Sequence, residues 1–99
     1  MTDTISLYTN PFSRGRIAHW MLEEVGAPYH VELLDFERNE HKSPEYLTLN
    51  PMGKVPAVRL EDGDMLTESG ALLYWFGRGT ELWPANERTR AEVLRWMFF

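Results

Sequence analysis

The sequence predicts an α/β domain with a mixed four-stranded sheet, its elements following the order βαβαββα. Two observations carry this prediction. Short β-prone runs alternate with segments of helical periodicity in the first half of the chain, and an Asp-Gly turn joins two apolar runs in the second half. The 99 residues are 43% apolar and include 13% aromatic residues, which is enough for one compact core.

The first strand is expected at residues 5–8, which are apolar and β-prone and are followed by the loop sequence Thr9-Asn10-Pro11. A helix is predicted over residues 13–25, where apolar residues recur on one face. Gly26 follows it in the position that favours a left-handed C-terminal residue. Residues 29–34 supply the second strand.

The second half begins with Ser43-Pro44, an N-cap with proline at the first helical position, which predicts a short helix ending at Leu49. Two short strands are expected at residues 57–60 and 65–67. The Asp62-Gly63 sequence between them is typical of a hairpin. A third helix is predicted from Glu68 to Phe76.

Strands that are separated by a helix pair in parallel, and a hairpin adds antiparallel strands, so the predicted topology is thioredoxin-like. Beyond residue 83 the composition changes to a capped, charged helix start that runs into Trp96-Met97-Phe98-Phe99. Such an apolar helix end calls for something to cover it. We therefore expect a first domain at residues 1–83 and, at residues 84–99, a linker and the first helix of an all-helical second domain.

The charge balance excludes several classes of partner. Fifteen acidic and 10 basic residues give a formal net charge of -5, which disfavours binding to nucleic acid or to anionic membranes.

Without cysteine the chain has no disulfide, thiolate metal site or thiol nucleophile. There is no signal-peptide pattern or long apolar segment, so a cytoplasmic location is expected.

Two segments together suggest a clamp for a small peptide. Asn50 to Val58 places a turn and Pro56 ahead of a strand, so that the N–H and C=O of Val55 are free to pair with an extended peptide. At the start of the third helix, Glu68 and Ser69 place a carboxylate and a hydroxyl beside free N–H groups. A small zwitterionic peptide fits this pair of features.

Three segments carry a close family resemblance: TNPFSRGRIAHWMLEEVGAPY, NEHKSPEYLTLNPMGKVPAV and EDGDMLTESGALLYW. In this order they resemble the N-terminal domain of a cytosolic glutathione S-transferase, of a bacterial, phi- or theta-like serine type. The resemblance implies that glutathione is the co-substrate, with neither a metal nor another cofactor. It also implies a homodimer that conjugates glutathione to a small electrophile.

The resemblance assigns roles to individual residues. Ser13, at the start of the first helix, is expected to donate a hydrogen bond to the thiolate of glutathione, which lowers the pKa of the thiol. Val55 and Pro56 would bind the cysteinyl main chain, and Glu68 and Ser69 the γ-glutamyl end. The basic side chains expected at the glycyl carboxylate are His41, Lys42 and Lys54.

The group that meets the sulfur is left open by the residues alone. Ser13 could merely cap its helix, and Thr9 or Asn10 could contact the sulfur instead, with Tyr8 a weaker candidate. Thr9 and Asn10 would suit a glutathione-dependent peroxidase or disulfide reductase on the same fold. A third reading is a non-catalytic relative that uses the fold for dimerisation.

Overall fold

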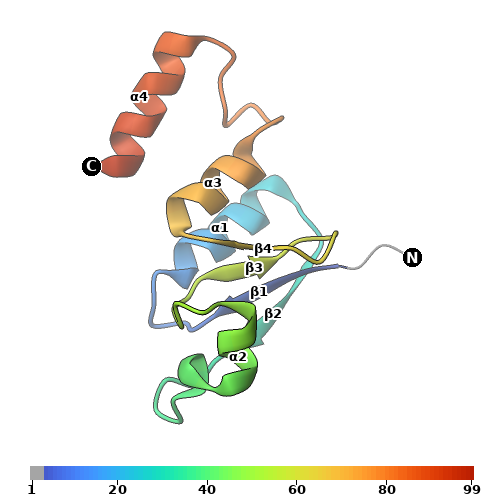
Figure 1. The fold of residues 1–99 in the computed structure, drawn as a ribbon. Coiled ribbons are helices and arrows are strands. Elements are labelled where there is room, and N and C mark those ends of the chain that lie inside the picture. The colour runs from blue at the N-terminus through green and yellow to red at the C-terminus, as the bar shows by residue number, and fades with distance from the viewer. Residues whose placement is uncertain (1–3) are drawn as a thin grey trace.

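The computed structural model describes residues 4–99 and contains the predicted mixed four-stranded sheet, drawn in Figure 1. The strand order is β2-β1-β3-β4; β1 and β2 are parallel, and the other two pairs are antiparallel. The strands are β1 (Ile5–Thr9), β2 (Tyr29–Leu33), β3 (Ala57–Arg59) and β4 (Met65–Thr67). The thioredoxin-like α/β topology expected from the sequence is confirmed.

Helices cover both sides of the sheet (Figure 1). They are α1 (Gly15–Val25), α2 (Pro44–Leu49), α3 (Ser69–Gly77), α4 (Glu87–Phe98) and the 3-10 helix η1 (Glu40–Lys42). Helices α1 and α3 pack together over one face, while α2 and η1 lie on the other. The core between the sheet and α1/α3 consists of Ile5, Leu7, Ala18, Leu22, Val58 and Leu72.

Helix α1 begins two residues later than predicted. The Ser13 hydroxyl donates to the carbonyl of Asn10 at 2.6 Å and accepts from the N–H of Gly15 at 3.0 Å, so residues 10–14 form turns before the helix proper. At the other end Gly26 adopts the predicted left-handed conformation, with φ 67°. The sequence therefore specified the end of α1 but not its start.

Three other local predictions are confirmed. The Ser43 hydroxyl accepts from the N–H of Tyr46 and caps α2, and the Asn86 side chain caps α4 by accepting from the N–H of Thr89. The Asp62-Gly63 turn joins β3 to β4, with Gly63 at φ 93°. Helix η1 was not predicted, because its three polar residues show no apolar periodicity.

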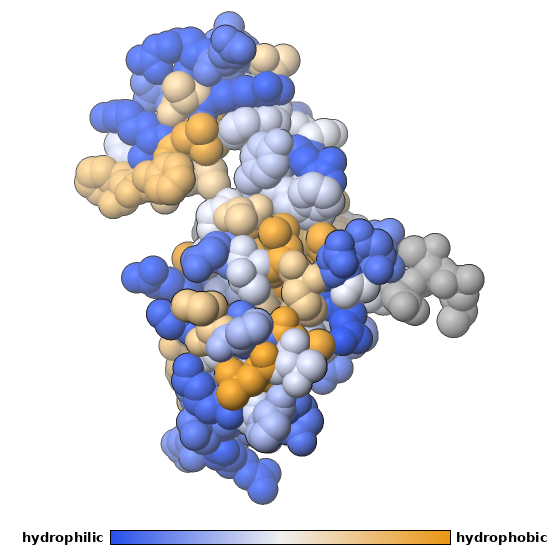
Figure 2. All heavy atoms as spheres, in the orientation of Figure 1, coloured by the Kyte–Doolittle hydropathy of each residue, from blue (hydrophilic) through white to orange (hydrophobic). Residues whose placement is uncertain are grey.

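Helix α4 lies apart from the sheet and is connected to α3 through residues 78–86 (Figure 1). The rings of Trp83 and of Tyr74 on α3 form a T-shaped pair, and the Arg90 guanidinium of α4 lies over the Trp83 ring, 5.2 Å from its centroid. The last residues of α4 form an apolar projection in Figure 2, and Phe98 and Phe99 are 85% and 97% exposed. Among residues 4–99 no helix has both the length and the apolar character needed to span a bilayer.

Candidate functional site

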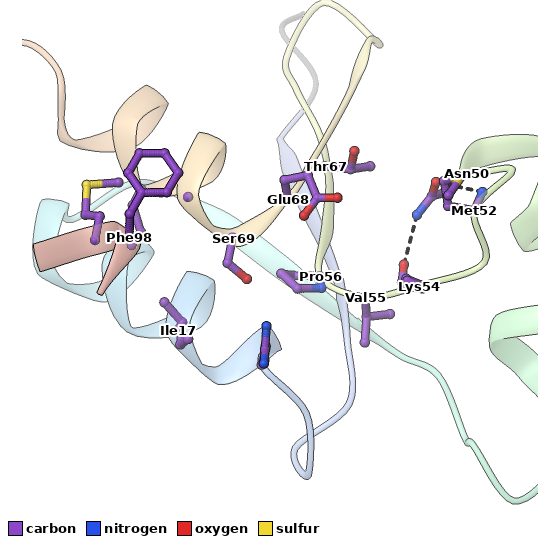
Figure 3. A pocket seen from close by; sticks show the side chains of 14 residues that line it. Ile17, Asn50, Met52, Lys54, Val55, Pro56, Thr67, Glu68, Ser69 and Phe98 are labelled. Carbon is purple, nitrogen blue, oxygen red and sulfur yellow. Dashed lines mark hydrogen bonds between the residues drawn. The ribbon is translucent and has the colours of Figure 1, made fainter. Parts of the chain in front are cut away.

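A cavity of about 620 Å³ lies where four parts of the chain meet: the start of α1, the loop before β3, the β4–α3 junction and the end of α4 (Figure 3). Asn50, Met52 and Lys54 lie at one end of it, and Ile17 and Phe98 at the other, with Val55, Pro56, Glu68 and Ser69 between them. The lining is completed by Arg14, Thr67, Gly70, Leu73 and Met97. One end is thus mostly polar and the other apolar.

Val55 lies in the loop before β3 and lines this cavity. The carbonyl of the preceding Lys54 accepts two hydrogen bonds, from the Tyr46 hydroxyl at 2.6 Å and from the Asn50 amide at 2.9 Å, and the Val55–Pro56 peptide bond is cis. Within residues 4–99 neither the N–H nor the C=O of Val55 has a hydrogen-bond partner. Both groups are available to an extended peptide, as the sequence predicted.

Tyr46 anchors this loop from α2 and is itself buried. Burial raises the pKa of the Tyr46 hydroxyl above its usual value because the phenolate would lose its hydration. The hydroxyl therefore keeps the proton that it donates to the Lys54 carbonyl. The position of Val55 is thus held by a neutral side chain that does not titrate near physiological pH.

Glu68 and Ser69 meet the cavity from the junction of β4 and α3. The Glu68 side chain is exposed and makes no capping bond, and Ser69 opens α3 and is half-buried. Glu68 has φ 76° and ψ 123°, a backbone region that suits glycine far better than a residue with a Cβ atom. Backbone strain of this kind clusters at active sites and ligand-binding sites.

The start of α1 was expected to meet the sulfur, and the structure shows which of its groups are already engaged. Ser13 does not line the cavity, and its hydroxyl and its main-chain N–H both donate to the Asn10 carbonyl. The Asn10 amide donates to the Leu34 carbonyl, and its oxygen accepts from the Phe12 N–H. To donate to a ligand, the Ser13 hydroxyl must rotate away from Asn10.

Two further candidates point elsewhere. Thr9 is buried beneath the start of α1; its hydroxyl oxygen would be 1.7 Å from a Cβ atom placed on Gly15, and it has no hydrogen-bond partner among the described residues. Tyr8 lines a different hollow, next to Tyr46. Neither side chain reaches the cavity in this geometry.

The two expected basic residues of η1 lie behind the rim rather than on it. The Lys42 ammonium is 3.5 Å from the carbonyl of Met52, which lines the cavity. The His41 ring packs on Phe36, with 4.4 Å between the centroids, and its Nδ1 is buried without a partner among residues 4–99. Of the three predicted basic side chains, only Lys54 lines the cavity itself.

Sequence reasoning missed several lining residues. Asn50 lies in the recognised Asn-Pro turn, but its hydrogen bond to the Lys54 carbonyl depends on the folded loop. Arg14 does carry a signal in the sequence, because a cation at a helix N-terminus opposes the helix dipole, but this signal fits a second subunit or a second domain as well as a ligand. Met97 and Phe98 carry no local signal, since only the path of the linker brings α4 to this side.

The charges suit a zwitterionic ligand. Arg14 and Lys54 are cationic and Glu68 is anionic, and the free main chain of Val55 lies among them. A small zwitterionic peptide can pair its backbone with Val55 and its ammonium with Glu68. Its carboxylates can pair with Arg14, with Lys54 and with the N-terminus of α3. Within the described part of the chain no cluster of three His, Asp or Glu side chains could hold a metal ion.

Residues 11–78 match the family model for the glutathione S-transferase N-terminal domain. Protein URE2 of Eremothecium gossypii is 36% identical over 88 residues, which cover 80% of this chain and 25% of that protein. A glutathione transferase homologue from Sulfitobacter, solved with bound glutathione, superposes with a TM-score of 0.90 at 35% identity, over 96% of this chain and 47% of that one.

A glutathione S-transferase from Pseudomonas fluorescens gives a TM-score of 0.88 at 33% identity, over 98% of this chain and 49% of that one. The chain therefore spans about half the length of these solved structures and about a quarter of the length of URE2.

Proposed function

Because the chain belongs to the glutathione S-transferase family through its N-terminal domain, we propose that its cavity binds glutathione and stabilises the thiolate for attack on a small electrophile. The observation that carries this proposal is the free main chain of Val55, which lies in one cavity with Glu68, Ser69 and Lys54. Glutathione has a peptide backbone, one ammonium group and two carboxylates. It complements each of these features.

The cysteinyl unit pairs with the N–H and C=O of Val55 as a short added strand, with Pro56 beside it. The ammonium of the γ-glutamyl unit meets the Glu68 carboxylate, and its carboxylate meets the hydroxyl and N–H of Ser69 at the start of α3. Lys54 binds the glycyl carboxylate. Lys42 and His41 support that end from behind the rim, Lys42 through its contact with the Met52 carbonyl.

In this orientation the sulfur is directed toward the start of α1. The Ser13 hydroxyl rotates from the Asn10 carbonyl to the sulfur and donates its hydrogen to the thiolate. One hydrogen bond to a charged group is worth about 1.5 to 3 kcal/mol, which lowers a thiol pKa by about 1 to 2 units. A larger fraction of thiolate, the nucleophilic form, is then present at neutral pH.

The electrophile occupies the apolar end of the cavity, between Ile17 and the α4 residues Met97 and Phe98. Residues 1–83 form the glutathione-binding domain in this proposal, and residues 84–99 lead into a helical domain. The protein acts in the cytoplasm as a homodimer, with a role in detoxification. These assignments rest on the family to which the chain belongs.

Calorimetric titration with glutathione tests the binding proposal. Glu68→Gln should weaken glutathione binding, whereas the matched change Glu61→Gln, on the β3–β4 turn outside the cavity, should not. No heat of binding with the unmodified protein would contradict the proposal and favour a non-catalytic role in dimerisation. Equal losses for the two variants would remove Glu68 from the site.

Reaction class is tested separately with three electrophiles: a chloro-nitroaromatic, a hydroperoxide and a small disulfide. Conjugation that falls in Ser13→Ala supports the transferase. Turnover of the hydroperoxide or the disulfide alone, lost in Thr9→Val rather than in Ser13→Ala, would instead support the peroxidase or disulfide reductase.

A further inference from the structure

Arg14 is the one cation that α1 contributes to the lining of the cavity. It precedes the helix as its N-cap residue, with φ -64° and ψ -8°, and its side chain is exposed. Among residues 4–99 neither its guanidinium nor its main-chain N–H has a hydrogen-bond partner, and it takes part in no described salt bridge. Its charge is therefore uncommitted.

The position of this charge is unfavourable without an anion. A helix N-terminus carries a partial positive charge, so a cation there is destabilising unless a negative group lies nearby. No acidic residue occurs in the first turn of α1. An anionic ligand atom at the start of α1 would satisfy the helix end and the guanidinium together.

The other groups at this point have fewer free donors. The Ser13 hydrogen is directed to the Asn10 carbonyl, and the Gly15 N–H is directed to the Ser13 oxygen. Among the described residues here, the Arg14 guanidinium keeps donors without a partner, so an anion can pair with it without breaking a hydrogen bond of the loop. Ser13 can contribute only after its bond to Asn10 is broken.

The surroundings of Arg14 separate its role from that of the other charged residues. Lys54 lies at the polar end of the cavity, and Glu68 lies at the β4–α3 junction (Figure 3). The other residues that α1, α3 and α4 contribute to the lining are uncharged: Ile17, Ser69, Gly70, Leu73, Met97 and Phe98. A thiolate between Val55 and the apolar end would have Arg14 as the cation supplied by the start of α1.

We infer that the Arg14 guanidinium pairs with the glutathione thiolate and, together with Ser13, promotes its ionisation. This inference rests on the proposed function. When the thiol ionises, its proton passes to water and the sulfur keeps the electron pair of the S–H bond. Arg14 is then a catalytic residue that contacts the nucleophile, whereas the carboxylates of glutathione are bound by Lys54 and the start of α3.

The test compares Arg14→Gln with Arg14→Lys and with Arg16→Gln. Arg16 lies in the first turn of the same helix, is also exposed and does not line the cavity, so its replacement controls for net charge and for the helix dipole. The readout is the ultraviolet absorbance of the thiolate against pH at saturating glutathione. Thermal unfolding of each variant is compared with that of the unmodified protein.

Arg14→Gln should raise the pKa of the bound thiol by about 1 unit, which is a tenfold fall in its ionisation constant. This magnitude is the low end of the range for a charge-assisted hydrogen bond, because the Arg14 side chain is exposed. Arg14→Lys should keep most of the effect, and Arg16→Gln should leave the titration unchanged. An unshifted Arg14→Gln, or an equal shift in Arg16→Gln, would overturn the inference.

S-methylglutathione, which has no ionisable thiol, distinguishes thiolate contact from carboxylate binding. Arg14→Gln should bind it as the unmodified protein does. A comparable loss of affinity for S-methylglutathione would overturn the inference and assign Arg14 to a carboxylate. If the unmodified protein binds neither compound, the proposed function fails as well, and the two failures are thereby distinguished.

Discussion

The backbone at Glu68 predicts that one substitution will stabilise the fold and weaken ligand binding. Glu68 has φ 76° and ψ 123°, where a Cβ atom is unfavourable, and its side chain has no capping bond. Glycine adopts this conformation without steric cost. Glu68→Gly should therefore relieve strain while removing the carboxylate that we assign to the glutathione ammonium.

The size of the effect follows from two opposing contributions. Strain at such a position costs about 1 to 3 kcal/mol. Glycine makes the unfolded chain more flexible, which returns about 0.5 to 1 kcal/mol of that gain. We expect a net increase of about 1 kcal/mol in the free energy of unfolding, or a rise of about 4 to 8 °C in Tm for a domain of this size.

Glu68→Gln is the matched control, since it keeps the strained backbone and removes only the charge. Its Tm should stay near that of the unmodified protein, because an exposed side chain usually changes stability by less than about 0.5 kcal/mol. Both variants should bind glutathione about tenfold more weakly, the effect of losing about 1.4 kcal/mol. Thermal unfolding and calorimetry measure the two quantities, and a Glu68→Gly variant no more stable than Glu68→Gln would refute the strain argument.

Three other predictions concern the supports of the site. Gly15→Ala should destabilise the fold by about 1 to 3 kcal/mol in a denaturant titration, because its Cβ would lie 1.7 Å from the Thr9 hydroxyl oxygen; unchanged stability would contradict this packing. Tyr46→Phe removes the hydrogen bond to the Lys54 carbonyl, so it should lower the free energy of unfolding by about 1 kcal/mol and should also weaken glutathione binding. Calorimetry that shows full affinity would argue against the anchoring role. Burial and the hydrogen bond to Glu23 raise the pKa of Tyr29 from 10.0 to about 12. As the pH rises, the unfolded chain loses the Tyr29 proton at a lower pH than the folded chain does, so Tm should fall between pH 10 and pH 12. The fall should be smaller in Tyr29→Phe, and an equal fall would contradict the assignment.

Most of the fold could be predicted because its signals are local. Gly26 ends α1, and the Asp62-Gly63 turn joins β3 to β4. Ser43 and Asn86 cap α2 and α4 through hydrogen bonds to residues three positions later. The start of α1 was misplaced by two residues because Ser13 bonds to Asn10 and Gly15 rather than opening the helix itself. The competing turn uses the same residue types that cap a helix, so sequence alone could not separate the two.

The candidate site was predictable in its main chain and less so in its side chains. Val55, Glu68 and Ser69 follow from turn and helix-start signals and lie in one cavity. His41 and Lys42 were expected as direct ligands, but η1 packs them behind the rim. Their direction depends on packing against Phe36 and the Met52 turn.

The sequence by itself determined the order of the elements, the caps and turns that bound them, and the turn and proline of the loop before β3, because each is encoded by residues close together in the chain. Only the tertiary structure decided that Arg14, Glu68 and Phe98 share one cavity, since they come from α1, the β4–α3 junction and α4. Their proximity depends on how the α1/α3 layer packs on the sheet and on how Trp83 and Arg90 direct α4. Contacts between residues so far apart in sequence have no local signal, because they are fixed by the shared burial of several elements at once.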